Sequence, residues 1–162
     1  MVNKYLIYSV LLGVLISGCA TTTPLLKGRD LTGNLVCLTD CSDIPAAIDK
    51  YAAVYDLDYG EGRTDYLLTR VRSIRGHIIR NGESFSPTEA LEYLRWKIDN
   101  HEKTHGASLI VDRAYIEEVL KGSASTGLPY EIVFEDGSRH DVKDVMLNEL
   151  DALDAYLARS KN

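Results

Sequence analysis

The chain has 162 residues, of which 45% are hydrophobic and 26% are charged, and its formal net charge at pH 7 is −6. This length suits one domain with a modest core once a short N-terminal segment is set aside. An acidic chain with dispersed arginines lacks the basic patch that nucleic-acid binding requires. We therefore expect no nucleic-acid partner.

Residues 1–18 have the layout of an export signal. Lys4 precedes an apolar run over 6–16 that is too short to span a bilayer as a helix. The run leads into I-S-G-C at 16–19, which resembles the lipobox of bacterial lipoproteins. The resemblance implies that 1–18 is removed and that Cys19 carries a diacylglyceryl group and further acyl chains such as palmitate. The alternative is an ordinary cleaved signal followed by a chance cysteine.

Ala20 bears on the destination of such a lipoprotein. In the enterobacterial sorting scheme, aspartate at this position retains a lipoprotein in the inner membrane, and alanine does not. We therefore expect a protein of the cell outer membrane that faces the periplasm. Residues 19–36 are polar, with Pro24 and two glycines and no sustained hydrophobic period, so we expect a flexible acylated tether.

The folded domain is expected to span residues 37–162, and a cysteine pair lies at its start. Cys37 and Cys41 form a C-x-x-x-C pattern, which in an oxidising periplasm most simply gives a local disulfide. A redox pair is disfavoured because the spacing is not C-x-x-C. A zinc pair would need two more ligands nearby.

The first half of the domain shows two helices and a hairpin. Apolar residues at helical spacing predict a helix over 46–59, and the G-E-G-R run at 60–63 is expected to break it. Thr64 can cap a second helix that ends at Gly76. Asn81 and Gly82 lie between apolar residues, a pattern that predicts a type I′ hairpin.

A capping box gives the clearest local signal. Ser86 at the N-cap, Pro87 at the first helical position and Glu89 at the third begin a helix that runs to about Asn100 and must end by Gly106.

The rest of the chain completes an α+β pattern. Asp112 can cap a further helix, and Asp136-Gly137 marks a second hairpin. The last helix is expected from about Val142 to Ala158. Five amphipathic helices and two short β-hairpins predict a small, mostly helical single domain.

Three stretches carry a resemblance to a family. I-I-R-N-G at 78–82, S-P-T-E-A-L-E-Y-L-R-W-K at 86–97 and A-Y-I-E-E-V-L-K-G-S-A-S-T-G-L-P-Y-E-I-V-F-E-D-G at 114–137 resemble the YfeK-like family of small exported bacterial proteins of unknown function. The resemblance covers roughly 65–150. It implies export and a shared domain, and it implies no reaction.

The stretch H-E-K-T-H at 101–105 matches the zinc-hydrolase pattern H-E-x-x-H. His101 and His105 would bind the metal, and Glu102 would act as base on the metal-bound water. Charged flanks and Gly106 instead favour a solvated helix end. The site would also need a third ligand, for which Glu149 on the last helix is the best candidate.

The loop over 121–130 is rich in small residues. Ser123, Ser125 and Gly127 could direct backbone N–H groups into one concavity that binds an anion. Arg80, Arg95 and Lys97 are the cations expected nearby, because the family resemblance includes them. The alternative is a tight structural loop. Trp96 and Tyr130 are expected to be core aromatics.

These observations favour a non-enzymatic function. We expect an outer-membrane lipoprotein that binds another envelope protein or assists envelope assembly, without catalytic residues, metal or cofactor. The alternative is a zinc-dependent hydrolase centred on residues 101–105.

Overall fold

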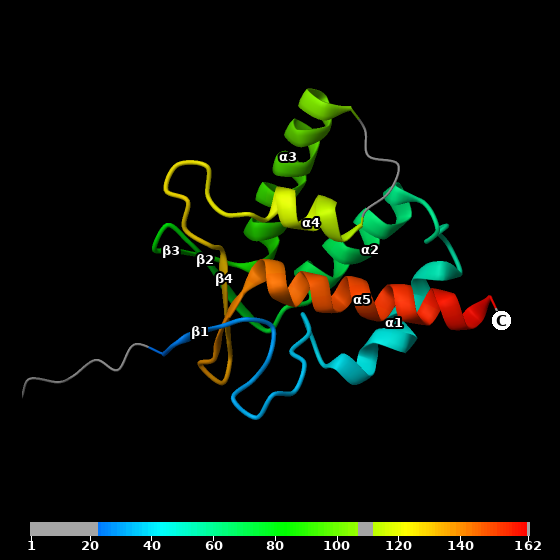
Figure 1. The fold of residues 1–162 in the computed structure, drawn as a ribbon, viewed down its shortest axis with the longest axis horizontal. Helices are drawn as coiled ribbons and strands as arrows, with labels where there is room; N and C mark the ends of the chain where they lie inside the picture. Colours follow the sequence, from blue (N-terminus) through cyan, green and yellow to red (C-terminus); the bar gives the residue numbers. More distant parts are fainter. Residues whose placement is uncertain (1–22, 107–111, 162) are drawn as a thin grey trace, which may run out of the picture.

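The computed structural model describes residues 23–106 and 112–161. The expected signal segment and Cys19 lie outside these residues. Within these residues, five helices and a five-stranded mixed sheet form one α+β domain, the fold class that the sequence predicts (Figure 1). None of the described helices is both long and apolar enough to cross a membrane.

The sheet is small and lies at one end of the molecule (Figure 1). Its strand order is β1-β5-β4-β2-β3. Only the β1–β5 pair is parallel among these neighbours. The strands are β1 (Leu25–Leu26), β2 (Gly76–Arg80), β3 (Glu83–Phe85), β4 (Glu131–Phe134) and β5 (Arg139–Asp141).

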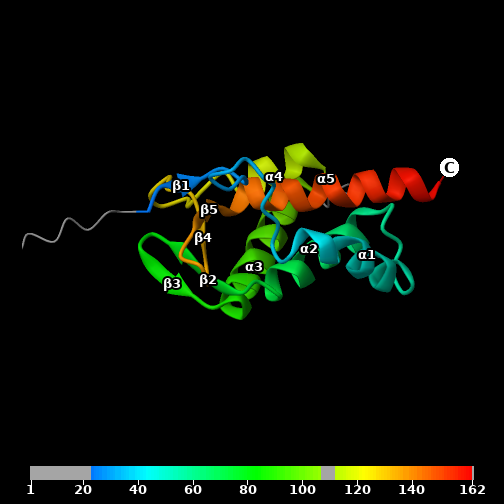
Figure 2. The ribbon, with the colours of Figure 1, turned by 90° about the horizontal axis from the view of Figure 1, so that it is seen from below.

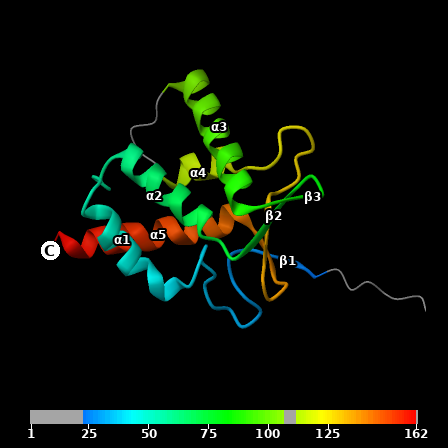
Figure 3. The same ribbon diagram turned by 180° about the vertical axis from the view of Figure 1, so that it is seen from behind.

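The helices pack mainly on one another beside the sheet. The long α5 contacts α1, α2 and α4, and α2 also packs against α3 (Figures 2 and 3). A 3₁₀ turn, η1 (Cys41–Asp43), precedes α1. The helices are α1 (Ile44–Ala52), α2 (Gly60–Arg72), α3 (Pro87–His105), α4 (Arg113–Val119) and α5 (Val142–Ser160). One apolar core joins these layers, with Ile48, Ile132 and Leu153 fully buried.

The G-E-G-R run starts a helix instead of breaking one. The helix α1 ends at Ala52, and α2 already begins at Gly60. A Cβ atom at Gly62 would lie 2.1 Å from the Asp56 carbonyl oxygen. This glycine therefore permits close packing of the preceding turn against α2.

The segment expected to be a flexible tether packs on the domain from Leu25 onward. We call residues 25–38 the N-terminal strap. Strand β1 pairs with β5, and the Asn148 amide donates to the carbonyl oxygens of Gly28 (2.6 Å) and Val36 (2.8 Å). The packed domain thus includes at least the twelve residues 25–36 that precede the expected boundary at residue 37.

The cysteine pair closes the end of this strap. The sulfur atoms of Cys37 and Cys41 lie 2.12 Å apart, at disulfide bonding distance, in agreement with the sequence prediction. Leu38 within the loop has no exposed surface and belongs to the core. The pair therefore lies where the strap joins the packed domain.

Candidate functional site

The N-terminal half of α3 forms one wall of a cavity. The capping box predicted at its start is present: the Ser86 hydroxyl accepts from the Glu89 N–H at 3.3 Å, and the Glu89 carboxylate accepts from the Ser86 N–H at 2.8 Å. This local bonding satisfies N–H groups that a helix start otherwise leaves unpaired. It fixes the start of α3 beside strand β3.

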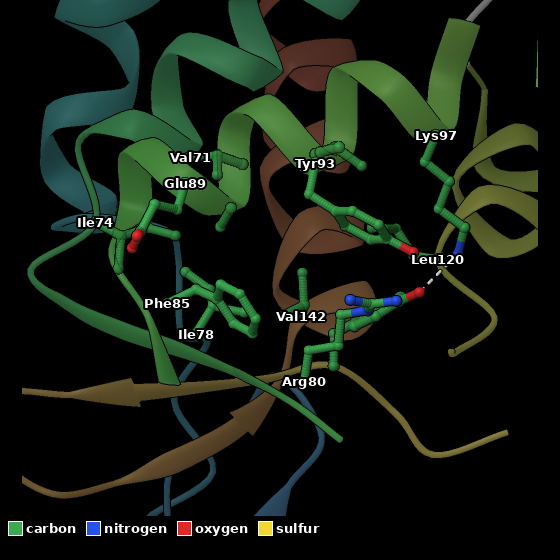
Figure 4. Close-up of a pocket in the computed structure, with 13 residues that line it drawn as sticks. Val71, Ile74, Ile78, Arg80, Phe85, Glu89, Tyr93, Lys97, Leu120 and Val142 are labelled. Carbon is green, nitrogen blue, oxygen red and sulfur yellow. Dashed lines mark hydrogen bonds between the residues drawn. The ribbon is translucent and has the colours of Figure 1, made fainter. Parts of the chain in front are cut away.

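The cavity has a volume of about 180 Å³ and lies between α3 and strands β2 and β3 (Figure 4). Its surface is mostly apolar, with ionisable side chains from α3 and β2 in its lining. The lining residues are Val71, Ile74, Ile78, Arg80, Phe85, Glu89, Ala90, Tyr93, Leu94, Lys97, Leu120, Tyr130 and Val142.

Two cations meet at one end of the cavity. Arg80 comes from the end of β2 and Lys97 from the middle of α3, and Figure 4 shows both near Tyr93. The Arg80 guanidinium lies over the Tyr93 ring, 4.2 Å from its centroid. Within the described part of the chain neither cation forms a salt bridge.

Lys97 is held by groups from the loop that follows α4. Its ammonium donates to the Gly122 carbonyl oxygen and to the Tyr130 hydroxyl, each at 3.1 Å; the second hydrogen bond is the dashed line from Lys97 in Figure 4. The partial burial of this side chain lowers the pKa of Lys97. A third ammonium hydrogen remains for a ligand, since an ammonium carries three donors.

Glu89 occupies the other end of the cavity, near Ile74 (Figure 4). Hydrogen bonds from Ser86 keep its pKa below the ordinary value. The carboxylate is thus committed to the helix cap, and it lies away from the two cations. The cavity therefore has separate cationic and anionic ends with apolar walls between them.

The small-residue loop does not form an open anion nest. The Ser123 N–H donates to the Leu128 carbonyl oxygen (2.9 Å), and the Gly127 N–H donates to the Ser123 carbonyl oxygen (2.8 Å). The Asn81 amide donates to the Ser125 hydroxyl (3.2 Å), which fastens the loop to the turn between β2 and β3. The loop instead positions Gly122 and Tyr130 against Lys97.

The three cations expected near this loop separate into two groups. Arg80 and Lys97 line the cavity, whereas Arg95 points to α2, where its guanidinium lies 3.6 Å from the Asp65 carboxylate. Trp96 is 57% exposed and stacks on Tyr93, so the expectation that it is a core residue is wrong. Tyr130, at 5% exposed, is a core residue as expected.

The H-E-x-x-H stretch occupies the last turns of α3. The helix ends at His105 and Gly106 follows with a φ of 87°, so α3 stops by Gly106 as the sequence predicts; His101 and Glu102 are half-buried, and residues 103–105 are exposed. The rings of His101 and His105 stack with centroids 4.4 Å apart, and His101 meets the edge of Tyr115. In residues 23–106 and 112–161 no three His, Cys, Asp or Glu side chains form a cluster that could hold a metal.

Glu149, the candidate third zinc ligand, instead lies in a buried network with Arg70 and Tyr66. It is fully buried, and its carboxylate pairs with Arg70 and accepts from the Tyr66 hydroxyl at 3.2 Å and from the Leu38 N–H at 3.4 Å. Burial raises the pKa of Tyr66, and the nearby Glu149 charge adds to that shift. The network ties α5 to α2 and to the strap.

Sequence reasoning missed the apolar part of the cavity. Ile78, Phe85 and Leu120 read as ordinary core residues, because periodicity marks a buried face without showing whether its neighbours fill it. The only usable signal was the spacing of Tyr93 and Lys97, which places them one turn apart on the same face of α3.

The comparisons with known proteins identify a family. A model described as "Family of unknown function (DUF5329)" matches residues 60–154. All residues that line the cavity fall in this range, whereas the strap and α1 precede it. Searches of curated proteins and of solved structures gave no match. Since the match covers more than half of the chain, the protein belongs to the family of unknown function DUF5329.

Proposed function

We propose that this protein is an outer-membrane lipoprotein, anchored through Cys19 and facing the periplasm, that acts as a non-enzymatic binding protein for another envelope protein. The lipobox-like sequence and the resemblance to the YfeK-like exported proteins support the anchor and the compartment. The cavity between α3 and β2 is the binding site. One observation carries this choice: two cations without a carboxylate partner in the described chain stand at one end of an apolar cavity.

The cavity size limits what enters it. An apolar cavity of about 150 Å³ in another protein holds benzene. The cavity here, at about 180 Å³, therefore suits one aromatic ring or one branched aliphatic side chain. Arg80 and Lys97 favour an anionic group next to it. An apolar residue beside a carboxylate, as at the C-terminus of a partner protein, meets both requirements.

The cationic end supplies specificity for the anion. Arg80 offers several N–H donors, and a hydrogen bond between charged groups contributes about 1.5–3 kcal/mol. Replacing Arg80 by glutamine removes the charge and keeps a polar side chain. We expect this change to weaken carboxylate binding by about 10- to 100-fold, because about 1.4 kcal/mol corresponds to a factor of ten.

Binding of benzoate, measured by methyl NMR shifts of Ile78 and Leu120, tests this function. Benzamide and benzylamine have the same ring without a negative charge, so they should bind more weakly than benzoate. Arg95→Gln is the matched control, because Arg95 lies on α3 outside the cavity and pairs with Asp65. Benzoate binding that Arg80→Gln leaves unchanged, or equal binding of benzylamine, would contradict the proposal.

The anchor has a separate test. Replacement of Cys19 by serine removes the thiol that would be acylated, so the protein should move from the membrane fraction to the soluble fraction and lose palmitate labelling. A protein that remains in membranes after this change is not a lipoprotein anchored at Cys19.

A further inference from the structure

The strap carries a small hairpin that exposes leucine side chains. Residues 29–35 form this hairpin, with Arg29 and Leu35 paired across it. Leu31 is 84% exposed at its tip and Leu35 is 52% exposed at its base. Two leucines exposed within five residues form a local apolar surface of the kind that marks an interaction site when it is contiguous.

The hairpin is held firmly in this position. The Asp30 carboxylate accepts from the Thr32 hydroxyl (2.7 Å), the Thr32 N–H (2.8 Å) and the Asn34 N–H (2.9 Å). These hydrogen bonds, led by the Thr32 hydroxyl, lower the pKa of Asp30 to about 2. The Asn148 amide holds both ends of the hairpin at Gly28 and Val36. The leucines therefore stay exposed because their backbone is fixed.

The length of chain before the hairpin points to a membrane as the partner. Cys19 and Leu25 are six residues apart, which is at most about 20 Å when fully extended. An acylated Cys19 would thus hold β1, and the hairpin that follows it, close to the bilayer. Lys27 and Arg29 are exposed in the same segment and suit lipid phosphate groups.

A second exposed apolar residue, Val54, lies too far from the anchor to insert into the same membrane. Val54 is 73% exposed in the turn between α1 and α2, and Asp58 of this turn pairs with Lys161 just after α5. The strap pairs with the sheet at the other end of α5 (Figure 1). A helix of 19 residues is about 28 Å long, so this turn lies beyond the reach of the anchor.

We propose that the 29–35 hairpin inserts Leu31 and Leu35 into the interfacial region of the membrane in which Cys19 is anchored. This inference rests on the lipid anchor of the proposed function. The docked hairpin orients the domain, with the sheet end toward the bilayer and the C-terminal end of α5 away from it. The apolar surface is then buried in lipid instead of in a partner protein.

The test uses the acylated full chain in vesicles of phosphatidylethanolamine and phosphatidylglycerol with brominated acyl chains, which quench nearby tryptophan. Leu31→Trp is introduced together with Trp96→Phe, which removes the single native tryptophan. Val54→Trp with Trp96→Phe is the matched control, since Val54 is similarly exposed at the far end of α5. We expect the Leu31→Trp protein to lose most of its emission and the Val54→Trp protein to retain it.

Flotation distinguishes a failure of the lipid anchor from a failure of hairpin insertion. A protein that floats with the vesicles and shows equal quenching of both variants keeps its anchor and overturns hairpin insertion. A protein that is not acylated and does not float overturns the anchor and the insertion together. A blue shift of Leu31→Trp emission without vesicles shows that a second copy covers the hairpin, which also overturns the inference.

Discussion

Helix α3 carries one row of ionisable and aromatic residues, and the two halves of this row contact different parts of the molecule. Glu89, Tyr93, Lys97, His101 and His105 follow one another at intervals of four residues. The first three line the cavity beside the sheet. The two histidines continue the row into the last turns of α3, where His101 contacts Tyr115 of α4 and His105 is exposed. This end of α3 extends beyond the sheet (Figure 1).

The geometry of the helix explains this difference. Four residues exceed one helical turn by about 40°, so the row rotates by about 160° between Glu89 and His105. The rotation carries the row away from β2 as the helix advances. A spacing of four residues therefore makes neighbours on a helix, and only the element opposite decides whether those neighbours face a cavity.

The largest expected effect concerns Glu149, the residue that would have completed a metal site with the C-terminal half of α3. Glu149→Ala should lower the free energy of unfolding by about 3–5 kcal/mol, because Arg70 then remains buried without its partner. Urea denaturation with and without zinc measures this. Glu117→Ala, which removes an exposed carboxylate, is the control and should change little.

A different result would restore the metal interpretation. If zinc stabilises the wild type and this stabilisation disappears in Glu149→Ala, then Glu149 binds metal and the two halves of α3 are both functional.

The second prediction concerns the pH dependence of the N-terminal half. Burial lowers the pKa of Lys97 below 10.5, so its charge is lost in the folded protein at a lower pH than in the unfolded chain. Benzoate affinity should therefore fall, by about tenfold, as pH rises through the lowered pKa. The free energy of unfolding should rise over the same interval, because the unfolded chain then binds more protons.

Titrations with benzoate at several pH values from 7 to 10.5 measure the expected fall in affinity. Lys97→Arg keeps its charge throughout and should bind with nearly constant affinity. A wild-type affinity that does not change with pH would mean that Lys97 does not contact the anion.

A smaller effect is expected at the helix start. Ser86→Ala removes the hydroxyl that bonds the Glu89 N–H and carboxylate, at a cost of about 1 kcal/mol. Thermal denaturation measures it, with Ser84→Ala on the exposed side of β3 as control. Equal stability of the two variants would show that the sheet alone positions this half of α3.

The smallest effect is expected at the C-terminal half. His101→Ala should change the free energy of unfolding by less than about 0.5 kcal/mol, since the contacts that it removes are ring contacts with His105 and Tyr115 at the end of a helix. Elemental analysis after exposure to zinc should give the same sub-stoichiometric content in wild type and variant. Stoichiometric zinc that the variant loses would contradict the contrast between the two halves.

Local signals predict both hairpins and the presence of the five helices, but they misplace the boundary between α1 and α2. The capping box at Ser86, the Asp112 cap and the Asn81-Gly82 turn act within a few residues, so the sequence displays them directly. The strap could not be predicted in this way, because β1 pairs with residues about 114 positions later. Its polar composition is also that of an ordinary linker.

The candidate site was predictable only in part. The sequence places Arg80, Arg95 and Lys97 together near the 121–130 loop; in the structure Arg80 and Lys97 line the cavity, whereas Arg95 faces α2. Glu149 looked like a free carboxylate, since no pattern in the sequence pairs it with Arg70, which is 79 residues away. Such side-chain partners depend on how the helices cross, and a single sequence does not contain that information.

The burial of Leu38, Ile44 and Ile48 has a consequence for where this chain can be cut without exposing its core. These three side chains belong to the same core as α2 and α5, yet they precede Gly60, where the family match begins. The match also stops at Asp154, inside α5. A fragment cut at these limits would expose the apolar surfaces that α1 and the strap cover. In this chain the segment that the family model matches is thus smaller than the segment that packs around one core.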